Sequence, residues 1–189
     1  MSLLALNQQH KSAKDVAGLE SHHMLEPHKY IAKYYEEKFL GLKEQTKKLI
    51  EIGVYHGASI KLWHDYFLNA TIYGIDKNSR MKNFFSTDEK YKDRCKIITG
   101  DSTNIDTYKE IPSDIDIVID DGSHRLFDQI KTFDLLFPKL KMGGLYIIED
   151  VLALDEVKQK LLDLHRSVKI YDFRDITNRH DSVLVEIVK

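Results

Sequence analysis

The chain has 189 residues, of which 42% are hydrophobic and 31% charged, enough for one domain with its own core. Its 28 basic and 30 acidic side chains give a formal net charge of −2, which argues against a general nucleic-acid binder. The single cysteine, Cys95, excludes an intrachain disulfide and a cysteine zinc site. Residues 1–18 lack the pattern of a signal peptide, and no apolar run approaches the ~20 residues of a membrane helix, so we expect a cytoplasmic protein.

The first half of the chain begins without a clear structural pattern. Residues 1–20 are polar and show no repeating apolar positions, which predicts a mobile leader before an ordered chain that begins near Ser21. Apolar residues then recur at helical spacing over 30–40, and Gly41 is a suitable end for that helix. Residues 48–53 form a short apolar run that is typical of a buried strand.

The rest of the chain alternates between strand-like and helix-like segments. We predict strands at 71–76, 96–101, 115–120, 145–149, 168–173 and 182–188. We predict helices at 59–68, 125–140 (broken near Pro138) and 156–166, with no helix between the last two strands. This order predicts an α/β, Rossmann-like fold: a seven-stranded, mostly parallel sheet with an antiparallel C-terminal strand and helices on both faces.

Acidic residues follow each of the five expected parallel strands. They are Glu51, Asp76, Asp101, the pair Asp120-Asp121 and the pair Glu149-Asp150. Ligands of open α/β sheets bind beyond the carboxyl ends of the strands, which is where these acids fall. Crowded carboxylates repel one another unless a ligand or cation offsets their charge, so the pattern predicts a binding site at this edge.

The loop after the first strand has glycines that permit a tight turn and the close approach of a ligand. Its spacing, Gly-x-x-x-Gly, departs from the Gly-x-Gly-x-x-Gly pattern that dinucleotide-binding folds use for a pyrophosphate. S-adenosylmethionine carries no phosphate, so a looser glycine spacing suits it; the alternative is an ordinary strand–helix turn. The candidate cofactor contacts here are Glu51, Gly53, Tyr55, Gly57 and Ser59.

Further cofactor contacts are expected at the ends of the next strands. Asp76 is placed to bind the ribose hydroxyls of either NAD or S-adenosylmethionine, or alternatively to cap a helix. Asp101 and Ser102 are candidates for the adenine, although Asp101 is also a suitable helix N-cap. Asp120 completes the candidate cofactor residues.

Five motifs, in order along the chain, carry a resemblance to a known family. They lie at residues 49–53, 62–67, 72–76, 120–124 (Asp-Asp-Gly-Ser-His) and 143–150 (Gly-Gly-Leu-Tyr-Ile-Ile-Glu-Asp). Over residues 28–150 the chain resembles the metal-dependent macrolide sugar O-methyltransferases and the cephalosporin-hydroxylase-like methyltransferases. The resemblance implies a class I methyltransferase fold, S-adenosylmethionine as methyl donor, and a single methyltransferase domain over 21–189.

The same resemblance implies a metal and a base. It implies Mg²⁺ bound by Asp121 and Asp150, and His124 as general base. The chemistry is consistent, since Mg²⁺ prefers oxygen ligands and a hard cation lowers the pKa of a bound hydroxyl. Histidine titrates near neutrality and can take the hydroxyl proton. The competing interpretation is that Asp121 caps a helix that begins near His124.

The third metal ligand stays open at this point. Glu149 is a possible ligand, although strand alternation points it away from Asp150. Glu36 or Glu37, on the first predicted helix, could supply the carboxylate instead.

We therefore expect a Mg²⁺-assisted, S-adenosylmethionine-dependent O-methyltransferase that acts on a sugar-like hydroxyl of a small molecule or glycan, with no nucleic-acid or membrane partner. An NAD-dependent oxidoreductase is the second interpretation, disfavoured by the glycine spacing. A non-catalytic protein that binds S-adenosylmethionine is the third. The short stretches before residue 48 and after Asp150 depart from the family and leave the acceptor unassigned.

Overall fold

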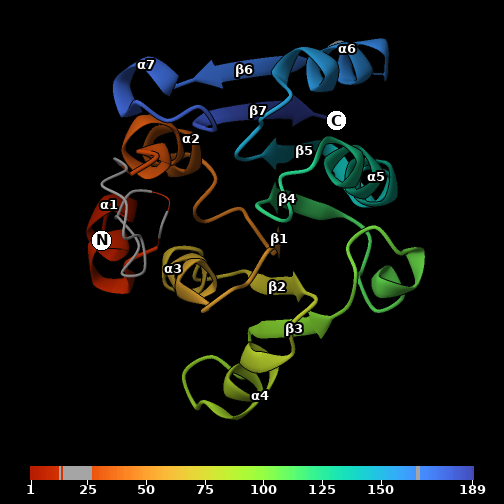
Figure 1. Ribbon diagram of the computed structural model, residues 1–189. Coiled ribbons are helices and arrows are strands. Elements are labelled where there is room, and N and C mark those ends of the chain that lie inside the picture. Colours follow the sequence, from red (N-terminus) through yellow and green to blue (C-terminus); the bar gives the residue numbers. More distant parts are fainter. Residues whose placement is uncertain (13, 15–26, 165–166) are drawn as a thin grey trace.

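The computed structural model describes residues 1–12, 14, 27–164 and 167–189, which form a seven-stranded sheet with helices on both sides (Figure 1). The strands are β1 (Lys48–Ile52), β2 (Thr71–Asp76), β3 (Cys95–Thr99), β4 (Ile115–Asp120), β5 (Leu140–Ile148), β6 (Val168–Asp172) and β7 (Val183–Val188). Their spatial order is β3-β2-β1-β4-β5-β7-β6. The first five strands pair in parallel, and β7 runs antiparallel to both of its neighbours. The predicted fold class is confirmed.

The central strands are buried on both faces, which explains their continuous apolar sequences. Successive side chains of a strand point to opposite faces. Leu49, Ile117 and Ile119 accordingly belong to one hydrophobic cluster, while Ile50 and Val118 belong to the other. All six residues of β4, the strand at the centre of the sheet, are buried.

Helices supply the second layer of each cluster. The helices are α1 (Leu3–His10), α2 (Glu36–Leu40), α3 (Ala58–Tyr66), α4 (Arg80–Thr87), α5 (Leu126–Leu136), α6 (Leu154–Leu164) and α7 (Arg174–Thr177). A π-helical turn, Ile31–Tyr35, precedes α2, and 3₁₀ turns span Ile105–Tyr108 and Phe137–Lys139. Side chains of α1, α3 and α4 pack in the first cluster, and side chains of α5 and α6 in the second (Figure 1). None of the helices in the described part of the chain is long and apolar enough to cross a membrane.

In the C-terminal half the break expected near Pro138 is confirmed, but the predicted end of that helix and the predicted connection from β6 to β7 were wrong. The helix expected over 125–140 ends at Leu136, and a 3₁₀ turn that contains Pro138 leads into β5 at Leu140. Proline lacks the N–H that a continuing helix needs, so the chain leaves the helix here. The connection from β6 to β7 was predicted to lack a helix, but it contains the single-turn α7.

The predicted leader was wrong over Leu3–His10, which form α1. Leu3 and Leu6 are buried in the first cluster, so packing against the domain stabilises a helix whose own apolar pattern is weak. Glu36 accepts a hydrogen bond from the backbone N–H of Leu4 (2.6 Å) at the start of this helix. Ser12 and Lys14 of the predicted leader are buried as well, while residues 13 and 15–20 lie outside the described residues.

A carboxylate on α3 holds α1 against the domain. Asp65 Oδ2 lies 2.8 Å from His10 Nε2 and 2.8 Å from Lys90 Nζ, and its Oδ1 lies 2.8 Å from His64 Nδ1. Burial raises the pKa of Asp65, but the hydrogen bonds from Lys90, His64 and His10 outweigh it and lower the pKa to about 2.

Candidate active site

The candidate site lies at the carboxyl ends of β1, β4 and β5, which are neighbours in the sheet. Its acids are Glu51, Asp120, Asp121, Glu149 and Asp150. Ile52 pairs with Asp120, and Asp120 pairs with Ile148, so the three strands end at one level. All of these acids except Asp121 are buried, and burying several carboxylates together is unfavourable without a compensating cation.

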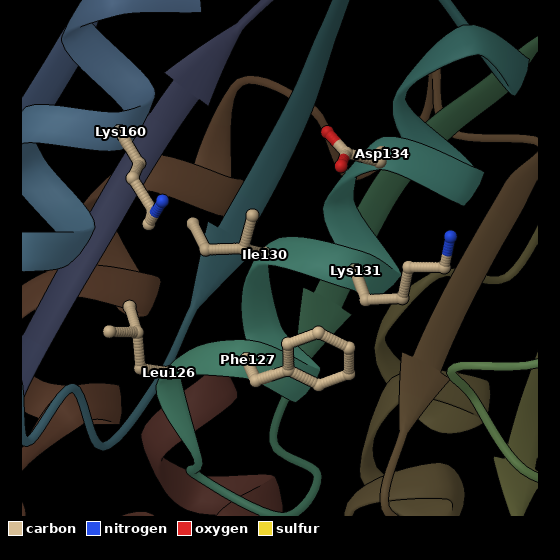
Figure 2. A pocket seen from close by; sticks show the side chains of 6 residues that line it. All are labelled: Leu126, Phe127, Ile130, Lys131, Asp134 and Lys160. Atoms are coloured by element: carbon tan, nitrogen blue, oxygen red, sulfur yellow. The ribbon is translucent and has the colours of Figure 1, made fainter.

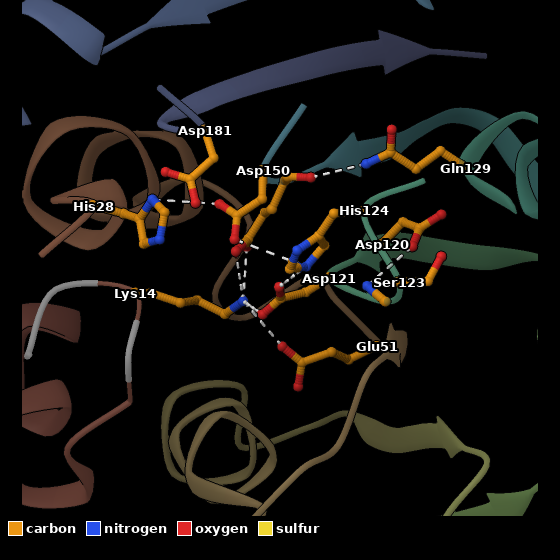
Figure 3. A network of polar contacts seen from close by, with 12 residues as sticks. Lys14, His28, Glu51, Asp120, Asp121, Ser123, His124, Gln129, Asp150 and Asp181 are labelled. Carbon is orange, nitrogen blue, oxygen red and sulfur yellow. Dashed lines mark hydrogen bonds and ion pairs between the residues drawn. The ribbon is translucent and has the colours of Figure 1, made fainter. Parts of the chain in front are cut away.

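Lys14 supplies a positive charge at the centre of this group (Figure 3). Its Nζ lies 2.7 Å from Asp121 Oδ2, 2.7 Å from Glu149 Oε2 and 3.3 Å from Glu51 Oε1. Burial lowers the pKa of Lys14, but the charges of Asp121, Glu149 and Glu51 outweigh it and raise the pKa well above its usual value. Sequence reasoning missed Lys14, because one lysine in a polar stretch gives no signal of partners 107 and 135 positions away.

His124 forms the second part of the site, beside the carboxylates. Its Nε2 lies 3.1 Å from Asp121 Oδ1 and 3.7 Å from Asp150 Oδ2. Burial lowers the pKa of His124, but the hydrogen bond and charge of Asp121 and the charge of Asp150 raise it to about 9. His124 and Asp150 have φ values of 57° and 53°, a left-handed conformation that is uncommon for residues other than glycine.

These three residues also fit a cation. Ligand atoms of Asp121, His124 and Asp150 lie within 4.8 Å of one another, close enough to contact a single ion. The Lys14 ammonium lies beside this group, where it pairs with Asp121 Oδ2 and with Glu149 Oε2. An oxygen-rich donor set of this kind suits Mg²⁺.

The structure also bears on which carboxylate could be the third metal ligand. Glu149 directs both carboxylate oxygens at Lys14, 2.8 and 2.7 Å from Nζ, and so faces the acid group. β5 ends at Ile148, so Glu149 and Asp150 lie beyond the strand to which the alternation argument applied, and Glu149 stays a predicted metal ligand. Glu36 instead contacts the start of α1, and Glu37 is exposed, so neither belongs to the site.

Three ring side chains that the sequence reasoning did not assign to the site surround Asp150 and Glu149. The Tyr30 hydroxyl donates to Asp150 Oδ1 (2.7 Å), and His28 Nδ1 lies 3.3 Å from the same oxygen. The Tyr35 hydroxyl donates a hydrogen bond to Glu149 Oε1. Burial and the charge of Asp121 raise the pKa of Asp150 to about 6, against the opposing effects of His124 and Tyr30.

A hollow of about 200 Å³ lies next to the acids, between the ends of β1, β2, β3 and β4. Gly53, Asp76 and Ser102 line it, as do Gly122 and Asp128. Three of these, Gly53, Asp76 and Ser102, were predicted as cofactor contacts. The hollow therefore has the location expected of a nucleoside site at the carboxyl edge of the sheet.

Two of the lining residues have backbone roles that shape this hollow. Asp76 Oδ2 accepts hydrogen bonds from the N–H groups of Val54 and Tyr55, both at 2.9 Å, and so fixes the loop after β1. Gly53 has a φ of 89°, and a Cβ atom there would lie 2.0 Å from the backbone oxygen of Asp121. Only glycine lets the two loops approach this closely.

The remaining predicted cofactor residues do not line the hollow. Ser59 donates to Glu51 Oε2 (2.6 Å), so both belong to the surroundings of Lys14. Tyr55 is 67% exposed on the outside of its loop. Gly57 precedes α3, where its backbone lies against the Phe85 ring.

Asp101 and Asp120, also predicted as cofactor contacts, have local partners. Asp101 accepts from Thr103 N–H (2.8 Å) and pairs with Lys77 (3.1 Å), so it stabilises a turn, whereas the N-cap of the following 3₁₀ turn, the alternative expected for Asp101, is Asn104. Asp120 Oδ1 accepts from Gly122 N–H (3.3 Å) below the hollow, and burial raises the pKa of Asp120 to about 7.

A second hollow, of about 280 Å³, lies on the outer side of α5 beside α6 (Figure 2). Leu126, Phe127 and Ile130 form its apolar part, with Lys131 and Lys160 at its border. It contains none of the acids at the strand ends and no histidine, so we place the active site at the first hollow.

Comparisons with known proteins point to one family. A family model described as a methyltransferase domain matches residues 50–151. Among curated proteins, 8-demethyl-8-alpha-L-rhamnosyl tetracenomycin-C 2'-O-methyltransferase of Streptomyces olivaceus is 31% identical over 134 residues, 66% of this chain and 33% of that protein. Mycinamicin VI 2''-O-methyltransferase of Micromonospora griseorubida is 32% identical over 134 residues, 65% of this chain and 31% of that protein. The chain thus spans about a third of the length of these relatives.

Solved structures agree on the fold. The MycE methyltransferase from the mycinamycin biosynthetic pathway, in complex with Mg and SAH, aligns with 100% of this chain and 55% of its own, with a TM-score of 0.68 and 24% identity. A putative caffeoyl-CoA O-methyltransferase from Staphylococcus aureus aligns with 77% of each chain, with a TM-score of 0.59 and 18% identity. Because the matched domain covers more than half of the sequence and the sheet has the corresponding strand order, the chain belongs to the methyltransferase-domain family and has the class I methyltransferase fold.

Proposed function

We propose that this chain is an S-adenosylmethionine-dependent O-methyltransferase that transfers a methyl group to a hydroxyl of a sugar-like acceptor. The observation that carries the proposal is the group formed by Asp121, His124 and Asp150 beside the glycine-lined hollow. The names of the similar curated proteins, which are sugar O-methyltransferases, support the substrate class.

In this proposal the hollow holds the methyl donor. Gly53 and Gly122 let a ligand approach the backbone, and Asp76 offers carboxylate oxygens to ribose hydroxyls. Ser102 borders the same hollow, where the adenine is expected. The loop after β4 carries Asp121 and His124, and its Gly122 and Ser123 line the hollow, which supports a reacting site next to the methyl donor.

The reaction needs an oxygen nucleophile in line with the sulfonium methyl group. In this proposal Asp121, Glu149 and Asp150 would hold Mg²⁺, and such an ion would lower the pKa of the acceptor hydroxyl and fix its position. His124 takes the hydroxyl proton as the oxygen–carbon bond forms and the sulfur–carbon bond breaks, which leaves S-adenosylhomocysteine and a methyl ether.

The protonation state of His124 fits this sequence of events. Asp121 and Asp150 raise its pKa to about 9, which favours the imidazolium when the carboxylates carry no cation. Carboxylates that hold a divalent cation would raise a neighbouring pKa less, which would favour the neutral imidazole that a base requires.

Calorimetric titration tests the proposal. S-adenosylhomocysteine and NAD are titrated separately, with and without Mg²⁺, into the wild type, Asp121→Ala and His124→Ala. We expect S-adenosylhomocysteine to bind all three proteins, and Mg²⁺ to bind the wild type and His124→Ala but not Asp121→Ala. Binding of NAD in place of S-adenosylhomocysteine would refute the assignment in favour of an oxidoreductase.

Methyl transfer to a panel of glycosides separates the enzyme from a protein that only binds the cofactor. His124→Ala should keep the affinity for S-adenosylhomocysteine and lose methyl transfer by about 10²–10⁴-fold, the usual contribution of a general base. Equal transfer rates in His124→Ala and wild type would remove His124 from the mechanism.

A further inference from the structure

Three tyrosines at the turn before α2 each donate a hydrogen bond to a buried carboxylate. Tyr30 donates to Asp150 Oδ1 and Tyr34 to Glu186 Oε2, both at 2.7 Å. Tyr35 donates to Glu149 Oε1. Glu149 and Asp150 belong to the candidate site at the end of β5, whereas Glu186 lies within β7.

The hydrogen bond from Tyr30 distinguishes the two oxygens of Asp150. Oδ1 accepts from the Tyr30 hydroxyl and has His28 Nδ1 at 3.3 Å on the same side. Oδ2 points the other way, with His124 Nε2 at 3.7 Å (Figure 3 shows Asp150 between His28 and His124). Oδ1 of Asp150 is therefore fixed by the Tyr30 hydroxyl, and Oδ2 faces Asp121 and His124.

The backbone alone does not decide which oxygen of Asp150 faces Asp121 and His124. Asp150 follows the end of β5 and adopts a left-handed φ of 53°, so the regular alternation of strand side chains does not set the direction of its side chain. Tyr30 is fully buried, with its ring stacked on His28 at a centroid distance of 4.9 Å. A buried, packed phenol keeps its hydroxyl in one place and so selects one orientation of the carboxylate.

We propose that Tyr30 is a positioning residue for the cation site: it occupies Oδ1 of Asp150 and thereby presents Oδ2 to the metal ion beside Asp121. This inference rests on the proposed function, since it assumes that Asp150 is a metal ligand. Hydrogen-bond partners behind the ligands of a metal site commonly change its affinity by about 10–100-fold when removed.

The chain supplies a matched control. Tyr34→Phe removes a hydroxyl from the same turn, at the same distance from a buried carboxylate, but that carboxylate lies outside the candidate site. Mg²⁺ is titrated calorimetrically into the wild type, Tyr30→Phe, Tyr34→Phe and Asp121→Ala, and the thermal stability of each is measured alongside. We expect Tyr30→Phe to bind Mg²⁺ about 10–100-fold more weakly and Tyr34→Phe to bind it as the wild type does.

A second readout reports the ligand geometry directly. Mn²⁺ replaces Mg²⁺ as a paramagnetic probe, and its electron paramagnetic resonance spectrum should change in Tyr30→Phe and stay unchanged in Tyr34→Phe. Equal Mg²⁺ affinity in Tyr30→Phe and wild type, or an equal loss in both tyrosine variants, would overturn the inference while leaving the metal site in place. Failure of the wild type itself to bind Mg²⁺ would instead overturn the proposed metal site.

Discussion

Replacing Lys14 with methionine should make the stability of the protein depend on Mg²⁺. The Lys14 ammonium lies 2.7 Å from Asp121, 2.7 Å from Glu149 and 3.3 Å from Glu51, where it offsets carboxylates that are otherwise crowded. A divalent cation bound to Asp121 and Glu149 cannot share that space with the ammonium, so Lys14 must withdraw from both carboxylates when the ion binds. Methionine has a similar length without the charge.

The expected loss of stability follows from burial. The Lys14 side chain is 3% exposed, and removing one partner of a buried ion pair costs about 3–5 kcal/mol, because the remaining charge stays buried. For a chain of this size that loss lowers Tm by about 6–20 °C. Mg²⁺ at about 100 times its Kd should raise the free energy of unfolding of Lys14→Met by about 2.7 kcal/mol. The increase should be smaller in the wild type, because Mg²⁺ has to displace the Lys14 ammonium there.

Thermal melts in EDTA and in a series of Mg²⁺ concentrations measure both effects. Lys38→Met is the matched control, because Lys38 pairs with the buried Glu186 at 2.8 Å and has no candidate cation site beside it. We expect Mg²⁺ to raise the Tm of Lys14→Met by more than it raises that of the wild type or Lys38→Met. The reasoning is refuted if the Mg²⁺-dependent shift is the same in wild type and Lys14→Met.

Three further predictions concern the loops, the cofactor and the N-terminal helix. Gly53→Ala should abolish Mg²⁺ binding in calorimetry and lower Tm, because the added Cβ would displace the Asp121 backbone. Gly143→Ala is the control, since Gly143 also has a positive φ, 74°, but a Cβ there would meet no atom within 4 Å. It should lose only about 1–2 kcal/mol of stability, the cost of a left-handed backbone for alanine, and still bind Mg²⁺. Asp76→Ala should weaken S-adenosylhomocysteine binding by at least about tenfold, roughly 1.4 kcal/mol, and unchanged affinity in a titration would exclude the ribose contact. Asp65 has its pKa lowered from 3.8 to about 2, so its stabilising charge is complete above pH 3.8 and lost as pH falls toward 2. Urea unfolding should therefore find Asp65→Asn less stable than wild type at pH 7, with a gap that narrows as pH falls below 3.8; a gap independent of pH would contradict this assignment.

The sheet could be predicted from the sequence because its strands are nearly continuous apolar runs. The expected limits of β2 and β4 agree with the observed ones, and the antiparallel ending followed from the short connection before β7. The helices were harder, because their ends depend on local backbone geometry and tertiary packing. The apolar residues of α1 follow one another without helical spacing, and only its contact with the domain shows why Leu3 and Leu6 are buried.

The acids of the site could also be located from sequence, since parallel strands bring their carboxyl ends to one edge. The sequence did not indicate which of those acids face the cofactor hollow and which face one another. Glu51 shows the difference: it follows the pattern of a cofactor contact, yet its oxygens face Ser59 and Lys14. The partners that orient the acids come from distant positions, and no spacing rule connects Lys14 with Glu149.

The N-terminal part of the chain supplies hydrogen-bond donors and a positive charge to the carboxylates at the sheet edge. Strands β1, β4 and β5 deliver carboxylates to one place, and a buried carboxylate needs hydrogen-bond donors or positive charge. The described residues before β1 provide both, in the ammonium of Lys14 and the hydroxyls of Tyr30 and Tyr35. Each donor contacts an acid of the candidate metal site, so these residues are part of that site and do not merely precede the domain. The geometry of the carboxylates therefore depends on residues before β1 as much as on the strands that carry the acids.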